Sequence, residues 1–356
     1  MISISLCMIV KNESEVLERC LNCVKHIVDE IVIVDTGSTD NTKSIAKKYT
    51  DSIYDFVWED DFSKARNFSF SKATKDYIMW LDADDILLEE DQKKLIQLKS
   101  TLNKDTSVVM MKYNVAFDEE GNPTYSFYRE RLVLNSMNFQ WIGAVHEVIE
   151  PKGNIMYSTI AICHRKLKKS DTNRNLRILE KCLQENGKLD TRQQFYYGRE
   201  LMYQGMYERA ITALETFIQL EDGWIENRID ACKDMGFCYG KLGMKEEQLS
   251  ILFYSFHFDV PRGEVCCDIG QCFLENNQYM QAIYWYKQAL NITPNTTSGG
   301  FYHLDCYSFI PYIQLCVCYD KLQNIEEAYK YHNMAKECKP NHPSVLYNEK
   351  YFQSCL

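Results

Sequence analysis

Three carboxylate side chains directly follow a short apolar segment in the N-terminal half of the chain. Residues 77–85 read Tyr-Ile-Met-Trp-Leu-Asp-Ala-Asp-Asp, which is typical of a strand buried on both faces that ends in Asp82, Asp84 and Asp85. Clustered carboxylates repel one another, and open parallel sheets bind ligands at the carboxyl ends of their strands. We therefore interpret the cluster as a divalent-metal site that holds a diphosphate. The alternative is an acidic, solvated helix start, because Asp favours N-caps.

Two other apolar segments of the same half also end in polar residues. The run Ile2–Val10 is followed by Lys-Asn-Glu-Ser, and Glu30–Asp35 continues into Thr-Gly-Ser-Thr-Asp, where Gly37 permits a tight turn before a helix expected over 41–49. Ser52–Val57 reads as a further short strand. Strands that alternate with helices predict a parallel α/β sheet with right-handed crossovers, so these polar ends should share one rim.

The segment Trp58–Asn67 lies between these strand ends and opens a further helix. An Arg and an Asn at a helix start can bind phosphate, because the guanidinium offers a charged fork and the helix N-terminus offers free N–H groups. The alternative is that Arg66 only pairs with Asp60 or Asp61.

Composition and missing motifs exclude several function classes. The net charge of −10 argues against a general nucleic-acid binder. The absence of the GxGxxG and Walker A patterns argues against hydride transfer and ATP hydrolysis. Apolar runs fall short of the ~20 residues of a membrane span, and the N-terminus lacks a signal-peptide pattern. The 15 cysteines read as reduced thiols, so we expect a cytoplasmic protein.

Four motifs together resemble glycosyltransferase family 2, whose fold is called GT-A. They are Ser5–Glu13, Ile33–Asp40, Trp58 with Asp61-Phe-Ser and Ala-Arg-Asn67, and Leu81–Asp84. The chain is similar in particular to bacterial members with tetratricopeptide repeats behind the catalytic domain, which include peptide S-glycosyltransferases of glycopeptide bacteriocin pathways. The resemblance implies a metal-dependent inverting enzyme that moves a sugar from a nucleotide diphosphate, expected to be a UDP-sugar, to a peptide or protein side chain.

The resemblance also implies roles for individual residues. Residues Val10–Glu13 and Asp35 would surround the base and ribose, and Asp82-Ala-Asp84 would be the DxD motif that holds the diphosphate through Mn²⁺ or Mg²⁺. Many members have two consecutive Asp where this chain has Asp35-Thr36, so recognition of the base stays open. The expected substrate-binding residues are Val10, Asn12, Glu13, Asp35, Gly37, Ser38, Asp61, Arg66, Asn67, Asp82, Ala83 and Trp141, and the expected metal ligands are Asp82, Asp84 and His164.

Residues 107–165 should complete the catalytic domain with three strands, Ser107–Phe117, Phe127–Leu134 and Ile155–Cys163. Between them, Trp141-Ile-Gly-Ala-Val-His-Glu147 suits a catalytic loop, because inverting transfer needs a base for the acceptor proton. We expect Glu147 to be that base, with His146 orienting it or contacting the metal. The alternative is a core histidine beside a Glu–Lys pair. His164 would complete the metal shell or, alternatively, close over the diphosphate.

Helical periodicity replaces the strand pattern after about residue 171. Small residues recur at Gly198, Gly236, Gly270 and Cys316, as in tetratricopeptide units, and Val345–Leu356 would be a capping helix. We predict an α/β GT-A domain over 1–168, with a mixed, mostly parallel sheet, and an all-α tetratricopeptide-like domain over 169–356. Such arrays bind peptides or other proteins, or dimerise, so a peptide acceptor or a homodimer is the expected partner. The alternatives are transfer to a saccharide or lipid-linked glycan, and a non-catalytic repeat scaffold.

Overall fold

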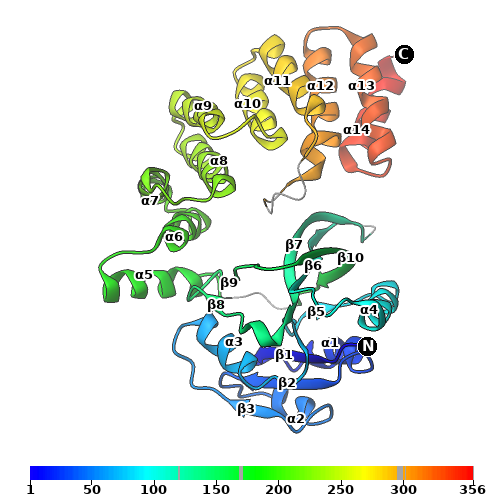
Figure 1. Cartoon of the computed structure of the whole chain (residues 1–356). Helices are drawn as coiled ribbons and strands as arrows, with labels where there is room; N and C mark the ends of the chain where they lie inside the picture. Colours follow the sequence, from blue (N-terminus) through cyan, green and yellow to red (C-terminus); the bar gives the residue numbers. More distant parts are fainter. Residues whose placement is uncertain (119–120, 168–170, 295–299, 301, 356) are drawn as a thin grey trace. The chain divides into compact units, whose positions relative to one another are not determined.

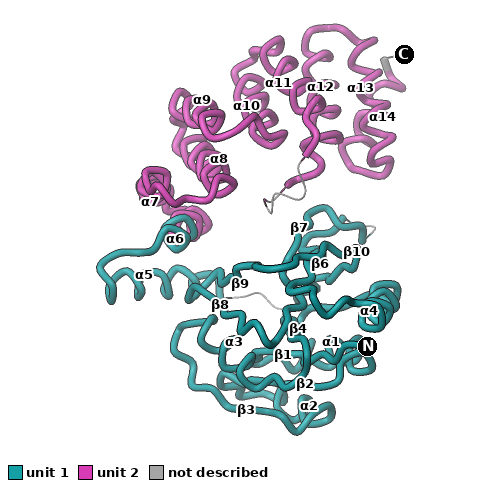
Figure 2. The backbone as a smooth tube through the Cα atoms, viewed as in Figure 1, with its two compact units in different colours: residues 1–196 teal, residues 197–356 magenta. Residues whose placement is uncertain are grey.

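The protein is described by a computed structural model that covers the chain except residues 119–120, 168–170, 295–299, 301 and 356. It divides into two compact units, Met1–Tyr196 and Tyr197–Leu356 (Figure 2). The domain boundary predicted between 168 and 169 falls on residues outside the described ones. The first unit runs well beyond it, to Tyr196.

The first unit contains a mixed sheet of eight strands in the order β3-β2-β1-β4-β7-β6-β10-β5 (Figure 1). Four of its seven pairings are parallel, which confirms the predicted mostly parallel sheet. A small antiparallel pair, β8 with β9, lies apart from it. The strands are β1 Ile4–Val10, β2 Glu30–Asp35, β3 Ile53–Asp55, β4 Tyr77–Trp80, β5 Asp85–Ile86, β6 Val108–Phe117, β7 Pro123–Leu134, β8 Trp141–Ile142, β9 Val148–Ile149 and β10 Ile155–His164.

Alternation along β1 sends side chains to two cores, one on each face of the sheet. Leu6 and Met8 join a core that includes Leu17 and Leu95 from helices α1 and α4. Cys7 joins the opposite core, with Trp80 and with Phe70 from helix α3. The helices of this unit are α1 Leu17–Val24, α2 Thr42–Ala46, α3 Phe62–Phe70, α4 Glu89–Thr101, α5 Arg174–Asn186 and α6 Thr191–Tyr203, which continues into the second unit.

The crossover helices are shorter than the sequence indicated. The helix expected over 41–49 is confined to α2, and helix α1 begins only at Leu17. The apolar residues Leu17, Leu21 and Val24 of α1 are buried. The polar segments between strand and helix are therefore longer, and they form the loops at the rim.

The second unit consists of helices packed in consecutive pairs, as in tetratricopeptide-like arrays (Figure 1). Gly198 shows why the small residue recurs, because a Cβ added there would lie 2.5 Å from Cγ of Leu214 on the next helix. The predicted capping helix is confirmed as α14. The helices are α7 Tyr207–Gln219, α8 Ile225–Lys241, α9 Lys245–Tyr254, α10 Gly263–Glu275, α11 Tyr279–Asn291, α12 Phe309–Lys321, α13 Ile325–Cys338 and α14 Pro343–Cys355.

Within the described part of the chain, no helix combines the length and apolar character that crossing a membrane requires.

Candidate active site

Two loops at the C-terminal rim of the sheet are locked to each other by hydrogen bonds. Asn12 follows β1 with a left-handed backbone (φ 57°), and its amide N donates to Ser38 Oγ over 2.8 Å. Its side-chain oxygen accepts from the amide of Thr39 over 2.7 Å. Glu13 is tied similarly, through its amide, to Thr42 Oγ1. The predicted nucleotide-binding positions after β1 and β2 therefore form one surface.

Asp35 lies fully buried beside this surface, at the end of β2. Its Oδ1 accepts from the amides of Gly37 and Ser38 at 3.0 and 2.8 Å, which explains why Gly37 has a φ of +102°. Its Oδ2 is buried and accepts no hydrogen bond from the described residues. A buried acceptor without a donor costs about 1–3 kcal/mol, so an N–H or O–H group of a ligand would be stabilised there.

Arg66 connects the end of β4 to the loop that precedes β9. Its NH2 donates to Asp82 Oδ1 over 2.7 Å, and its Nε donates to Glu147 Oε1 over 2.6 Å. The guanidinium lies over the rings of Trp80 and Trp141, at 5.0 and 4.7 Å from their centroids. One buried cation therefore fixes the first carboxylate of the Asp-Ala-Asp motif and the predicted base.

The charges of this bridge determine the titration of its members. Burial alone would raise the pKa of Asp82, but Arg66 and Arg131 outweigh it and lower the pKa to about 2. Burial would lower the pKa of Arg66, and the charges of Asp82 and Glu147 raise it instead.

The predicted catalytic loop, residues 141–147, is fastened to α3 at three points. Asn67 exchanges two hydrogen bonds with the backbone of Trp141, at 2.8 and 3.0 Å. The amide of Phe62 donates to the carbonyl of Ala144, and Arg66 holds Glu147. These contacts revise two predictions. Both ends of the Asn67 amide are engaged with backbone, and Trp141 is only 2% exposed, so each positions the loop and leaves little surface for substrate.

The orienting role predicted for His146 falls to Arg66. Glu147 is oriented by Arg66, while the imidazole of His146 stacks on Tyr196 with a centroid separation of 4.0 Å. The alternative that Arg66 pairs with Asp60 or Asp61 is wrong. Asp60 pairs with Lys181, and Asp61 caps α3 by accepting from the amide of Lys64.

Asp84, Asp85 and His164 gather at the other side of the motif. Their ligand atoms lie within 4.8 Å of one another, and Nδ1 of His164 is 3.3 Å from Asp84 Oδ1. Burial raises the pKa of Asp84. Burial would lower the pKa of His164, but its hydrogen bond to Asp85 and the charge of Asp84 raise it. Two of the three predicted metal ligands are thus adjacent, whereas Asp82 is turned toward Arg66.

Asp85 is fully buried and acts as the anchor of this turn. Its Oδ2 accepts from Arg131 NH1 and from the amide of Asp82, both at 3.0 Å, and its Oδ1 accepts from the hydroxyl of Tyr113. The hydroxyl of Tyr113 is also 2.9 Å from Nδ1 of His164. Nδ1 is therefore the ring nitrogen that faces Asp84 and Asp85, and Tyr113 holds the imidazole in this orientation.

Sequence reasoning assigned no role to Arg129, Arg131 or Tyr113. Arg131 is fully buried against Trp80, with 3.7 Å from its guanidinium carbon to the ring centroid, and Arg129 donates to the carbonyl of Glu147. The available signal was the charged triplet Arg-Glu-Arg inside an otherwise apolar strand, because buried charges need partners.

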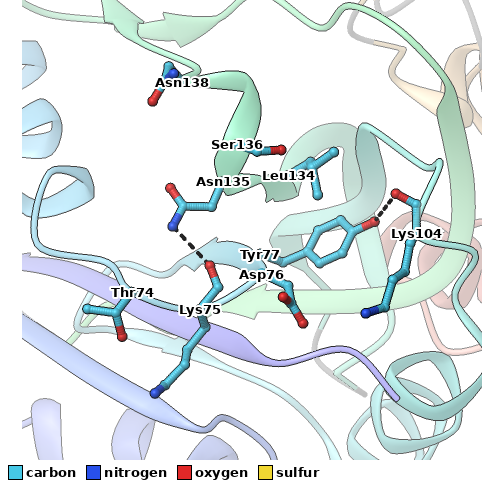
Figure 3. Close-up of a pocket in the computed structure, with 9 residues that line it drawn as sticks. All are labelled: Thr74, Lys75, Asp76, Tyr77, Lys104, Leu134, Asn135, Ser136 and Asn138. Carbon is cyan, nitrogen blue, oxygen red and sulfur yellow. Dashed lines mark hydrogen bonds between the residues drawn. The ribbon is translucent and has the colours of Figure 1, made fainter.

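A cavity of about 430 Å³ lies away from these carboxylates, around the residues that precede β4 (Figure 3). It is lined by Lys75, Asp76 and Lys104, and the side chain of Asn135 donates to the carbonyl of Lys75 there. None of the predicted site residues lines it, so we do not assign the reaction to it.

Comparison with known proteins agrees with this geometry. Residues 5–167 match the model of glycosyl transferase family 2, a segment that contains Arg66, Asp82, Asp84, Glu147 and His164. The N-terminal part of the chain is similar to glycosyltransferase family 2 over this segment.

Among curated relatives, a TPR repeat-containing protein of Synechococcus elongatus is 38% identical over 42% of this chain and 36% of its own length. The glycosyltransferase SunS of the SPbeta prophage of Bacillus subtilis is 32% identical over 59% of this chain and 52% of its own. The chain thus spans about a third to a half of the length of these relatives. A solved structure of MamA covers 47% of this chain and 82% of its own, with 18% identity and a TM-score of 0.38.

The side chains of the family 2 domain fit a hard divalent cation. The carboxylate of Asp84 and a ring nitrogen of His164 offer an oxygen and a nitrogen ligand from two separate segments. Asp85 is committed to Arg131 and Tyr113, so it orients these ligands. Mn²⁺ accepts such a mixed set, and Mg²⁺ retains waters beside one or two carboxylates.

Proposed function

We propose that this chain is a metal-dependent inverting glycosyltransferase that moves a sugar from a nucleotide diphosphate, with UDP as the expected nucleotide, to a peptide or protein side chain. The observation that carries the proposal is the bridge of Arg66 between Asp82 and Glu147. The guanidinium of Arg66 holds the Asp-Ala-Asp motif and the carboxylate of Glu147, which can act as a base, next to each other. They lie at the sheet edge where α/β proteins bind ligands.

The donor would lie across the loops that follow β1 and β2. The unsatisfied Oδ2 of Asp35 supports a contact with a base N–H or a ribose hydroxyl. Asp84 and His164 would hold Mn²⁺ or Mg²⁺, which when bound stabilises the negative charge that develops on the departing diphosphate.

Glu147 would act on the acceptor. As the nucleophilic atom of the acceptor forms its bond to the anomeric carbon, Glu147 takes the proton from that atom, and the bond between the sugar and the diphosphate breaks with its electron pair on the phosphate oxygen. Arg66 holds Glu147 in one orientation, and the short Nε–Oε1 distance supports a fixed carboxylate. A single displacement of this kind inverts the anomeric centre.

The repeat unit supports a peptide or protein acceptor. Arrays of paired helices present extended surfaces for such partners, and aromatic side chains contribute much of the contact energy at such surfaces. The fourteen cysteines that the structure describes are free thiols, which supports a reducing compartment such as the cytoplasm. Exposed aromatic side chains of this unit include Trp224, Phe237, Tyr254, Tyr284 and Tyr347.

The test is a screen of nucleotide sugars with the full-length protein. Release of the nucleoside diphosphate is measured with Mn²⁺, with Mg²⁺ and after chelation, and transfer is read as added mass on candidate peptides. We expect cation-dependent release with a UDP-sugar, and loss of release in Asp84→Asn. Arg177→Ala, a change in an exposed ion pair, is the control and should retain activity. Full activity in excess chelator, or no release from any nucleotide sugar, would contradict the proposal.

A further inference from the structure

The first turns of α6 contact the catalytic loop, although α6 lies beyond the segment that matches the family model. The ring of Tyr196 lies flat on the imidazole of His146, with 4.0 Å between centroids and 9° between planes. Arg192, one turn earlier on α6, donates from Nε to the carbonyl oxygen of His146 over 3.1 Å. Tyr196 is 8% exposed, and His146 is half-buried beneath it.

Arg192 and Tyr196 behave as one unit. They are four residues apart on the helix and thus neighbours on its surface. NH2 of Arg192 donates to the hydroxyl of Tyr196 over 3.3 Å, and the guanidinium lies 4.9 Å from the ring centroid. The adjacent Phe195 is fully buried, and its ring packs edge-on against that of Tyr196, with 5.1 Å between centroids. The side chains that touch His146 are therefore presented from a firmly packed helix.

The loop needs support at this position because its backbone is strained there. His146 has a φ of 53°, in the left-handed region that a residue with a Cβ avoids, and such a conformation costs about 1–3 kcal/mol. Other parts of the loop are held by α3, through Asn67 at Trp141 and Phe62 at Ala144. At His146, the ring of Tyr196 and the guanidinium of Arg192 provide contacts from α6. The strained residue lies directly before Glu147, so its conformation sets the direction in which that carboxylate leaves the backbone.

We propose that Arg192 and Tyr196 are positioning residues for Glu147: they hold His146 in its left-handed conformation and thereby keep the adjacent carboxylate on the Arg66 bridge. This inference rests on the proposed function, in which Glu147 is the base. The working catalytic unit then extends to Tyr196, about thirty residues past the end of the family match, in agreement with the extent of the first compact unit.

The first test is steady-state hydrolysis of a UDP-sugar by the full-length protein. In Tyr196→Ala we expect kcat to fall by about ten- to a hundredfold, as for a slightly misplaced catalytic group, with KM for the donor changed by less than about twofold. Tyr196→Phe keeps the stack and should stay within about twofold of wild type. Tyr203→Ala removes an exposed Tyr from the same helix and is the matched control. A Tyr196→Ala enzyme with wild-type kcat overturns the proposal.

A second variant separates positioning from general destabilisation. His146→Gly removes the ring on which Tyr196 stacks, and Gly adopts the left-handed conformation without strain. The contacts from α6 are then no longer needed to hold the backbone. In the His146→Gly background, Tyr196→Ala should then change kcat by less than about twofold, whereas independent effects would multiply. Multiplying effects would contradict the proposal. If Tyr196→Ala does not fold, Tyr196→Leu fills most of the same space without a flat ring and is expected to show the loss in kcat.

Hydrogen exchange measures the stability of the loop conformation without requiring turnover. Amides of residues 143–147 should exchange at least about tenfold faster in Tyr196→Ala than in wild type, and at the wild-type rate in Tyr203→Ala. If wild type turns over no nucleotide sugar but this difference is present, the proposed function fails and the support of the loop by α6 stands. If turnover is present and neither kcat nor exchange responds to Tyr196→Ala, the proposed function stands and the positioning role fails.

Discussion

Replacing Arg66 by Met should both destabilise the first unit and abolish turnover. Met retains an apolar chain between Trp80 and Trp141 but leaves Asp82 and Glu147 without their cation. The shift of the Asp82 pKa from 3.8 to about 2 corresponds to about 2 kcal/mol of net stabilisation. Unpairing Glu147, which is 13% exposed, adds to this loss. We expect about 3 kcal/mol in total, somewhat less than for a fully buried pair, because the side chain of Asp82 is 32% exposed.

The measurement is calorimetric unfolding of wild type and variant over a range of pH. A loss of about 3 kcal/mol should lower the transition of a unit of this size by roughly 6–12 °C at neutral pH. The pKa of Asp82 in the folded protein lies below its ordinary value, so its contribution is present above about pH 4 and is lost as the pH falls toward 2. The deficit of Arg66→Met should therefore shrink below about pH 4.

Two further variants make this prediction specific. Arg66→Lys keeps the charge, but one ammonium cannot reproduce the fork that spans both carboxylates, so kcat should still fall by about a hundredfold. Arg177→Met removes an exposed ion pair with Asp171 and should cost less than about 1 kcal/mol. If Arg66→Met unfolds at the same temperature as Arg177→Met and retains turnover, the ion pairs of Arg66 contribute neither to stability nor to catalysis.

Three other predictions follow from the same structure. Asp84→Asn should weaken Mn²⁺ binding by at least about tenfold in calorimetric titration, whereas Asp91→Asn, at a carboxylate paired with Lys94, should leave it unchanged. The pKa of His164 is raised in the folded protein, so its stabilising contribution is full below about pH 6.5 and lost as the pH rises through the folded value. Metal-free His164→Gln should therefore be less stable than wild type at about pH 5.5 and closer to it at about pH 8.5, and a constant difference would refute the assignment. Gly198→Ala should destabilise the second unit by about 1–3 kcal/mol, because the new Cβ meets Leu214. Gly240→Ala, where the neighbour is the flexible end of Gln248, is the control, and equal losses would show that close approach at Gly198 is not the cause.

Local patterns in the sequence predicted the elements of this fold well. The apolar runs gave β1, β2 and β4 within a few residues, because a strand buried on both faces requires continuous hydrophobicity. Periodic small residues predicted the helix pairs, since Gly198 and its counterparts mark points where two helices approach closely. Element ends were less certain, as α2 shows. They depend on where side chains such as Asp40, which accepts hydrogen bonds from Thr42, satisfy the first turn.

In the candidate site, too, some neighbours could be predicted from the sequence and others could not. Asp84 and His164 could be predicted to be neighbours, because both lie at strand ends on the same rim of the sheet. The rim at which a strand ends follows from the topology, which the alternation of strands and helices in the sequence predicts. The partners of Arg66 could not be assigned from spacing. Its partner at Glu147 is 81 residues away in the chain, and nearer carboxylates such as Asp60 were equally plausible by sequence. Only packing decides which of several acids a buried cation meets.

The sequence by itself determined which segments become strands and helices, which rim carries the carboxylates, and which family the N-terminal part resembles. These depend on hydrophobic periodicity, turn residues and contiguous motifs, all of which are local. Tertiary structure decided that Asp82 turns to Arg66 and not to Asp84 and His164, that Asp85 is an anchor for Arg131, and that Tyr196 supports His146. Each of these is a contact between residues far apart in the chain. It is selected by the cost of burying an unpaired charge or a strained backbone, which no local pattern encodes.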